Sequence, residues 1–347
     1  MSTEAVNLFN PSISLPIERV KKTTFFEWFF ILMGALPLYL PFLFLLGERG
    51  LSGQNPIYWY FWITAIFSSP HVYSTYYRLN RKIKENKIGF AVGWPAYFLI
   101  VFGLILAQLN GFFLQAMTAV NVIQSYHYLR QVYGTYRLLG RSQTESKNEM
   151  SLSFYAFHLA VPLFVFGRWD TLYTVWGGKA STAIIPVDFS AAFMDFCFAL
   201  AIVAIIFAVV LEVIKFKNSP QSYNPVGAVI LCTYFLIHWF GFLSVEYYQR
   251  GFFAVTIFHA IQYFGLLWYM EWKSDTKTLI SNIKNIPFAL AFPLIWGVVF
   301  ILGFTFENKI VSLGNFFFPS LATILLGAVS AHHYFVDAFM WRRQAGK

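Results

Sequence analysis

The chain has 347 residues, of which 58% are hydrophobic, 21% are aromatic and 12% are charged. Soluble proteins carry about 25% charged residues, so this composition excludes a disordered chain, a nucleic-acid reader and a cytosolic enzyme. The formal net charge of +9 does not indicate nucleic-acid binding, because the basic residues lie in short loops between apolar runs. Both cysteines, Cys197 and Cys232, lie inside apolar runs and predict neither a disulfide framework nor a thiolate metal site. The composition indicates a polytopic membrane protein.

Ten apolar runs are long enough to cross a bilayer as helices, since a span needs about 20 residues. We therefore predict an all-α fold, a polytopic integral membrane helical bundle that forms a single domain over residues 1–347. Lysine and arginine occur in alternate loops, which predicts that both termini are cytoplasmic. Prolines inside several runs, Pro95 among them, predict local kinks. The runs cover residues 24–46, 56–77, 88–108, 111–130, 151–169, 189–213, 226–247, 252–272, 286–305 and 317–341.

All seven histidines lie within or beside apolar runs, where polar groups are costly and usually mark function. Any single histidine could equally be hydrogen-bonded to a neighbouring helix as structural glue. Five of them lie on four runs that lead inward, at depths of roughly 5 to 20 Å from the cytoplasmic end. We therefore expect one layer of histidines in the cytoplasmic half of the bilayer. These five are His71, His127, His259, His332 and His333, whereas His158 and His238 fall at similar depth without an assigned role.

A polar residue follows each of four histidines by three or four positions, which places it on the same helix face. Metal-bound imidazoles need such partners to fix their tautomer and orientation. Gln262 and Asp337 are also candidate ligands, and Asp337 is the better one because it is anionic. The pairs are His71 with Thr75, His127 with Gln131, His259 with Gln262, and His333 with Asp337.

Tyrosines are frequent around the histidines, and we select Tyr73 and Tyr334 as candidate catalytic residues that orient ligands or carry protons. The alternative interpretation of the tyrosines is an interfacial aromatic belt. Arg78 follows the second run and is expected to be a cytoplasmic anchor. The run over 189–213 has no histidine in its cytoplasmic half, so we expect an outer helix that faces lipid.

Imidazole ligands suit iron, copper, zinc and nickel. Several imidazoles with one carboxylate and no cysteine favour non-haem iron, bound as one or two ions. A closed tetrahedral zinc site would not need so many ligands. Copper stays possible, although no Met-rich or Cys ligand set accompanies the histidines.

Four segments carry a resemblance to a known group of enzymes: SPHVYSTYYR at 69–78, SYHYLRQVYG at 125–134, FHAIQ at 258–262 and HHYFVDAFMW at 332–341. Their dispersed histidines resemble those of the integral-membrane non-haem iron oxygenases and desaturases, and of the bacterial β-carotene dioxygenases of the Brp/Blh type. The resemblance implies an oxidative reaction on a lipid or isoprenoid. The chain differs from these enzymes in lacking HxxxH and HxxHH boxes, and Val72 follows His71 where a PHG motif has glycine.

The sequence therefore predicts a metal-dependent membrane oxygenase or oxidoreductase, in a bacterial inner membrane. Its expected partners are membrane lipids, an apolar small-molecule substrate and a cytoplasmic electron donor, with no nucleic acid. Two alternatives stay open: a haem-binding electron-transfer protein with two histidines facing each other, and a transporter with a histidine relay. A transporter would be expected to have charged residues near the membrane midplane and internal repeats. The carboxylate nearest to the midplane is Asp195, and we find no internal repeat.

Overall fold

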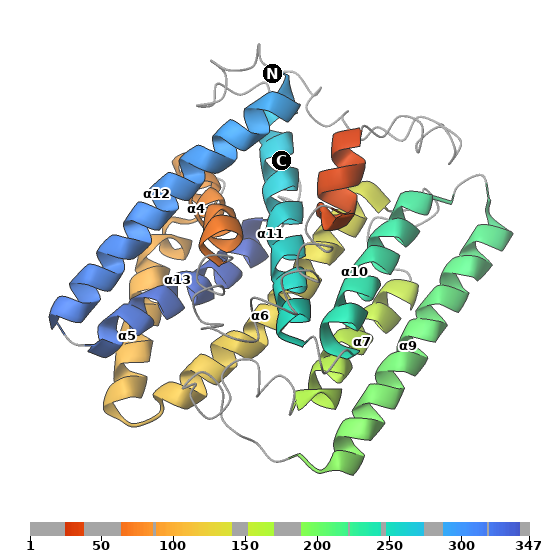
Figure 1. Ribbon diagram of the computed structural model, residues 1–347, viewed down its shortest axis with the longest axis horizontal. Helices are drawn as coiled ribbons and strands as arrows, with labels where there is room; N and C mark the ends of the chain where they lie inside the picture. The colour runs from red at the N-terminus through yellow and green to blue at the C-terminus, as the bar shows by residue number, and fades with distance from the viewer. Residues whose placement is uncertain are drawn as a thin grey trace, which may run out of the picture. The chain divides into compact units, whose positions relative to one another are not determined.

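The computed structural model describes residues 25–37, 64–85, 88–140, 152–169, 189–220, 223–243, 248–273, 287–317 and 319–340 (Figure 1). Within these ranges the regular elements are helices and no strand occurs, which confirms the predicted all-α class. The elements are η2 (Glu27–Leu32), η3 (Thr64–Ser68), α4 (Ser69–Lys84), η4 (Phe90–Val92), α5 (Trp94–Leu109), α6 (Phe113–Thr135), η5 (Tyr136–Gly140), α7 (Leu152–Gly167), α9 (Ala191–Asn218), α10 (Pro225–Leu243), α11 (Tyr248–Lys273), α12 (Phe288–Phe317) and α13 (Pro319–Met340).

Local sequence signals account for several helix ends. Ser190 caps α9, because its side chain accepts a hydrogen bond from the backbone N–H of Phe193. Lys215 and Lys217 lie in the last turn of the same helix, where positive charge interacts favourably with the helix dipole. Pro95 lies in the first turn of α5. It therefore begins this helix instead of producing the kink expected from the sequence.

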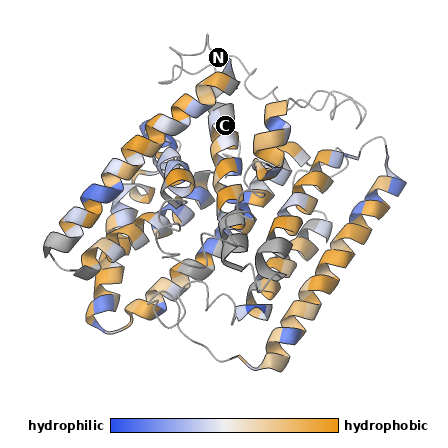
Figure 2. Cartoon of the chain, in the orientation of Figure 1, coloured by the Kyte–Doolittle hydropathy of each residue, from blue (hydrophilic) through white to orange (hydrophobic). Residues whose placement is uncertain are grey.

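Three described helical stretches are long and apolar enough to cross a membrane: Phe90–Leu109, Ala191–Asn218 and Leu290–Gly314. Figure 2 shows that α9 is hydrophobic along most of its length. The described part of the chain is thus all-α, with helices of membrane-spanning length. The predicted cytoplasmic location of the termini concerns residues 1–24 and 341–347, which lie outside the described residues.

Helix α12 differs most from its predicted run. It continues to Phe317 through residues 306–315, which the sequence indicates as a loop. Ile310 in this stretch is buried in a hydrophobic cluster with Ile324 and Ala328 of α13. Burial of one apolar face therefore extends the helix despite the polar residues on its other faces.

The chain divides into two compact units. Helices α6 and α12 each contribute residues to both units, and the single domain expected from the sequence stays a prediction. Unit 1 comprises Met1–Pro56, Gln131–Leu172 and Asp188–Phe292, and unit 2 comprises Ile57–Arg130, Tyr173–Val187 and Pro293–Lys347.

In unit 1, α7 packs along α9, and α10 contacts α11, η2 and η5. The contact of α10 with η5 is made at glycines, since a Cβ at Gly140 would lie 2.5 Å from the Cα of Gly227. Small residues permit such close approach between membrane helices. Helix α9 likewise buries a face of small residues that includes Ala201, Ala204 and Ala208. Small side chains thus permit close packing at the contact of α10 with η5 and on the buried face of α9.

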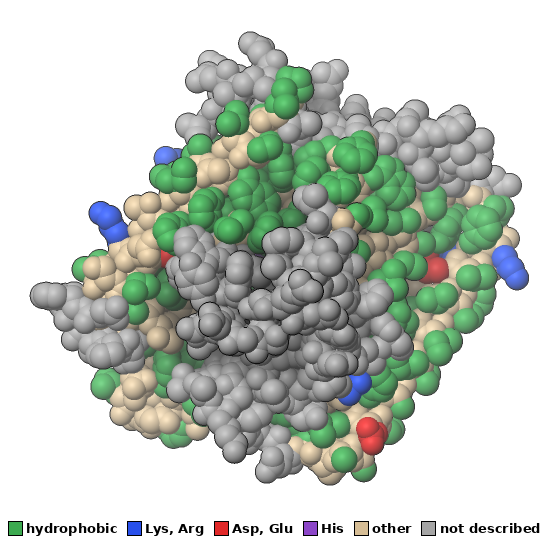
Figure 3. Space-filling model, in the orientation of Figure 1, with side chains coloured by type: hydrophobic (Ala, Val, Ile, Leu, Met, Phe, Trp, Pro, Cys, Tyr) green, Lys and Arg blue, Asp and Glu red, His purple; other side chains and the backbone are tan. Residues whose placement is uncertain are grey.

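The opposite face of α9 is apolar and exposed. Val203, Phe207 and Val210 on this face are between 46% and 59% exposed. On the face drawn in Figure 3, hydrophobic side chains cover much of the surface of the described residues, with few acidic or basic ones. Extended apolar surfaces of this kind are rare on water-soluble monomers, and they fit the prediction of a helix that faces lipid.

In unit 2, α13 packs against both α4 and α5. Tyr97 and Leu104 of α5 share a buried cluster with Ile324 of α13. The Tyr76 hydroxyl of α4 donates a hydrogen bond to the Val329 carbonyl oxygen of α13 at 3.1 Å. These contacts hold α4 and α13 together at the level of their histidines.

Candidate metal centre

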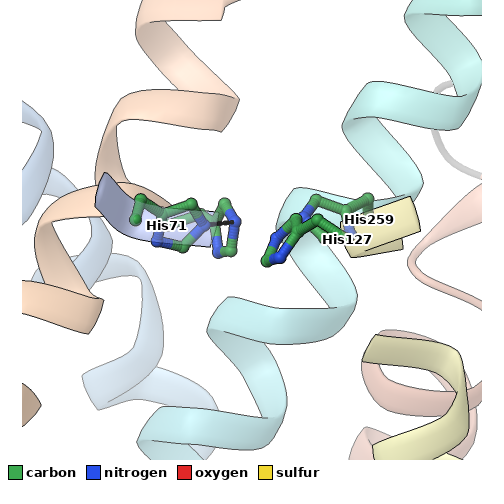
Figure 4. Close-up of side chains that lie close together, drawn as sticks. His71, His127 and His259 are labelled. Atoms are coloured by element: carbon green, nitrogen blue, oxygen red, sulfur yellow. Dashed lines mark hydrogen bonds between the residues drawn. The ribbon is translucent and has the colours of Figure 1, made fainter. Parts of the chain in front are cut away.

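Three buried histidines of unit 2 could serve as ligands of a metal ion, namely His71, His127 and His333. The predicted ligand His259 lies in unit 1. Each imidazole offers one ring nitrogen. The rings of His71 and His127 point toward one another in Figure 4, where His259 is also labelled. Among the described residues, the donors that this group offers are imidazole nitrogens.

Within unit 2 the candidate ligand nitrogens of His71, His127 and His333 lie within 4.8 Å of one another. The Nε2 atoms of His71 and His333 are 2.9 Å apart. The ring centroid of His127 lies 4.8 Å from that of His333 and 6.1 Å from that of His71. Because α4, α6 and α13 each supply one ring, the cluster forms only when unit 2 is folded.

Asp337 adds a carboxylate to the same cluster. It follows His333 by one helical turn on α13, which directs both side chains to one face. Its Oδ2 atom lies 3.6 Å from His127 Nε2 and 3.9 Å from His333 Nε2. Asp337 is only 5% exposed, and a buried carboxylate needs a positive partner. A metal ion or a protonated imidazole would provide one.

The separations of these donor atoms are compatible with a shared metal ion. Two ligands at about 2.1 Å from one ion lie about 3.0 Å apart at a right angle and about 3.4 Å apart in a tetrahedron. The 2.9 Å between His71 and His333 therefore corresponds to adjacent ligands. The 3.6 Å and 3.9 Å from Asp337 correspond to wider angles at the ion.

The two candidate catalytic tyrosines have different surroundings. The ring centroid of Tyr334 lies 4.8 Å from that of His127 and 5.6 Å from that of His333. Tyr73 instead packs against Phe306 of α12, with 5.7 Å between ring centroids. Residues 71 and 73 point about 200° apart around a helix. The structure therefore brings Tyr334 to the cluster and leaves Tyr73 on the opposite face of α4.

His332 makes its own contacts, separate from the cluster. Its Nδ1 lies 3.0 Å from the Tyr76 hydroxyl, and its Nε2 lies 2.9 Å from the Val92 carbonyl oxygen. Neighbouring residues on a helix point about 100° apart, so His332 and His333 meet different partners. The structure brings His333 into the predicted ligand set and engages both ring nitrogens of His332 elsewhere.

Two glutamines form a hydrogen-bond chain beside the backbone of His259 on α11 in unit 1. The Gln131 side-chain amide donates to the His259 carbonyl oxygen at 2.9 Å and to Gln262 Oε1 at 3.2 Å. Gln262 Nε2 donates in turn to the Ile31 carbonyl oxygen at 2.8 Å. The oxygen and the nitrogen of the Gln262 amide therefore both form hydrogen bonds within the protein. This predicted ligand thus orients helices within unit 1.

Replacing Gln131 by leucine should lower the stability of the protein. The substitution leaves the His259 carbonyl and the Gln262 amide oxygen buried without this donor, which costs about 1–3 kcal/mol. Thermal unfolding followed by tryptophan fluorescence would measure the loss. Gln108→Leu on the exposed side of α5 is the matched control, with an expected change within about 0.5 kcal/mol. Equal melting temperatures for the two variants would contradict the assigned role of Gln131.

Three charged residues were not selected from the sequence as candidate site residues. Arg78 is buried at 8% exposure, although the sequence suggests a cytoplasmic anchor. Glu307 of α12 accepts a hydrogen bond from the Ser69 hydroxyl at 2.8 Å. Glu212 of α9 accepts one from the Ser153 hydroxyl. The available signal was the same each time, namely a charged residue within or within a few positions of a predicted apolar run.

Comparisons with known proteins assign no family. No family model matches the chain, and no curated protein or solved structure matches it. The resemblance to non-haem iron oxygenases therefore stays an expectation from the sequence.

Proposed function

We propose that this protein is a membrane-embedded, metal-dependent oxidoreductase whose metal ion is held by His71, His127, His333 and Asp337. The observation that carries the proposal is the convergence of three imidazole nitrogens and one carboxylate oxygen in unit 2. The four residues are between 0% and 5% exposed. Ionisable residues inside apolar helices are costly and usually functional, so four of them in contact support a common task.

His259 belongs to unit 1, and its role as a metal ligand stays a prediction from the sequence. Within that unit Gln131 holds the backbone of His259 by a hydrogen bond. The three imidazoles and one carboxylate of unit 2 would leave two positions of an octahedral ion open for small reactants.

Iron is the metal that we propose, as one or two non-haem ions. Imidazole and carboxylate donors with open positions are typical of non-haem iron, whereas structural zinc sites are closed tetrahedra. When bound, iron would supply the redox chemistry that side chains alone lack. Copper and zinc are tested by the same measurement below.

The remaining chemistry falls to the protein. Asp337 would balance the positive charge of the ion and keep the neighbouring imidazoles oriented. Tyr334, whose ring contacts His127 and His333, is the residue that we propose holds or moves a proton during the reaction. Burial of the cluster excludes water from the reacting groups.

The substrate that we propose is a lipid or isoprenoid that enters sideways from a bacterial inner membrane. Support comes from the apolar exposed faces of the described helices, such as Leu294, Ile301 and Leu302 of α12, which are 61–66% exposed. We further propose about ten membrane spans with both termini cytoplasmic. A cytoplasmic donor would then supply electrons, because the histidines are expected in the cytoplasmic half.

One observation favours a second function, a histidine relay in a proton-coupled transporter. The Nε2 atoms of His71 and His333 are within hydrogen-bonding distance at 2.9 Å, and Asp337 adjoins His333.

A haem between the rings of His71 and His333 fits less well. Two nitrogens that bind one haem iron from opposite sides stand about 4 Å apart, given metal–nitrogen bonds of about 2 Å, whereas these two Nε2 atoms are 2.9 Å apart.

Metal analysis and a visible spectrum distinguish these functions. We expect full-length protein purified without chelator to contain one or two irons per chain and to show no Soret band. His158→Ala, which removes a half-buried histidine of α7, should keep the same metal content. A strong Soret band would indicate a haem protein instead. Substoichiometric metal of every kind would refute the metal site and leave the relay.

A further inference from the structure

An apolar cavity of about 300 Å³ lies among α7, α9 and α10 of unit 1. Phe157 of α7, Ala208 and Phe216 of α9, and Leu231 and Phe235 of α10 contribute to its walls. A volume of this size lies at the lower end for small-molecule sites. Apolar walls favour an equally apolar occupant, and a slender hydrocarbon chain meets both conditions.

Glu212 is the one charged residue among those that line the cavity. It is 9% exposed, and its position is fixed from two sides. The Ser153 hydroxyl of α7 and the Lys215 ammonium both donate to Glu212 Oε1, the latter at 2.9 Å. The cavity thus presents a carboxylate held in place, whereas Lys215 does not line it.

Tyr223 adds a hydroxyl group to the same cavity lining. It lies in the connection between α9 and α10, and burial, followed by the negative charge of Glu212, raises its pKa to about 12. The phenol therefore stays protonated and neutral near pH 7. A carboxylate and a neutral hydroxyl are the polar groups that an occupant would meet.

We propose that this cavity binds a neutral single-chain lipid with a hydroxyl head group, a long-chain alcohol, whose hydroxyl donates a hydrogen bond to Glu212. An ionised carboxylate can only accept hydrogen bonds, so the head group must be a donor. A fatty acid would place a second carboxylate beside Glu212, which like-charge repulsion disfavours. The exposed apolar face of α9 is suited to contact with the bilayer that holds such lipids. The proposal is independent of the metal cluster in unit 2.

The two natural cysteines allow a direct test on the full-length protein. Cys232 is exposed and lines the cavity, whereas Cys197 is buried. The rate at which N-ethylmaleimide alkylates Cys232 is measured by mass spectrometry in nanodiscs, with hexadecanol or hexadecanoic acid added. We expect hexadecanol to protect Cys232 at concentrations about tenfold lower than hexadecanoic acid does. Repulsion between two carboxylates that shifts a pKa by one unit changes an equilibrium constant by the same factor of about ten.

Variants separate the head-group contact from the chain site. Glu212→Gln removes the negative charge, so the acid should then protect as well as the alcohol. Ala228→Phe narrows the cavity and should abolish protection by hexadecanol. Ala199→Phe, on an exposed position of α9, is the matched control and should retain it. Equal protection by alcohol and acid in the unmodified protein, or protection that persists in Ala228→Phe, would overturn the proposal. An absence of protection in unmodified protein would also overturn it.

Discussion

Replacing His333 by alanine should abolish stoichiometric metal binding while the helices still fold. His333 Nε2 lies 2.9 Å from His71 Nε2 and 3.9 Å from the Asp337 carboxylate, so it adjoins two other proposed ligands. Loss of a hydrogen-bond partner of a metal ligand already costs 10–100-fold in metal affinity. Loss of the ligand itself should cost at least about 100-fold. Elemental analysis of purified protein, with size-exclusion profiles to confirm folding, measures the effect.

The adjacent His332→Ala variant is a stringent control. His332 and His333 are both fully buried, but the nitrogens of His332 contact Tyr76 and Val92. His332→Ala should therefore keep its metal and lose about 1–3 kcal/mol of unfolding free energy, because buried polar partners are left unsatisfied. If His333→Ala kept full metal content, the proposed centre would be wrong. If only His332→Ala lost metal, the sequence-based inclusion of His332 would be right.

Replacing Gly227 by valine should destabilise the protein severely. A Cβ at this position would collide with the carbonyl oxygen of Gly140, and the obstacle is backbone rather than a flexible side chain. Overpacking at such a contact costs about 3 kcal/mol. Thermal unfolding in detergent should show a large drop in melting temperature.

Gly103→Val provides the matched control for this prediction. Gly103 lies in helix α5, and a Cβ there would meet nothing within 4 Å. Valine is a slightly better helix former than glycine, so the melting temperature should stay the same or rise. Similar melting temperatures for the Gly227 and Gly103 variants would show that the approach of α10 to η5 is looser than described.

Helix geometry alone made part of the candidate site predictable. His333 and Asp337 are four residues apart, and helical periodicity places them on one face whatever packs against it. The all-α class was equally accessible, because long apolar runs have few other ways to satisfy their backbone in a membrane. These inferences depend only on residues close together in the chain.

Tertiary contacts decided what the sequence left open. His332 and His333 are equivalent candidates by composition, and only the positions of Tyr76 and Val92 separate them. Gln131 follows His127 by one turn, yet its side-chain amide donates hydrogen bonds to His259 and Gln262. Which polar group meets which partner depends on how the helices pack, and periodicity within one helix carries no information about it.

The continuation of α12 through residues 306–315 has a consequence for membrane insertion and labelling. One residue separates the end of α12 at Phe317 from the start of α13 at Pro319. The two helices therefore follow one another in the chain almost without interruption. A reporter tag placed at 306–315 would interrupt a helix and probe folding instead of sidedness, so topology mapping requires insertion sites elsewhere in the chain.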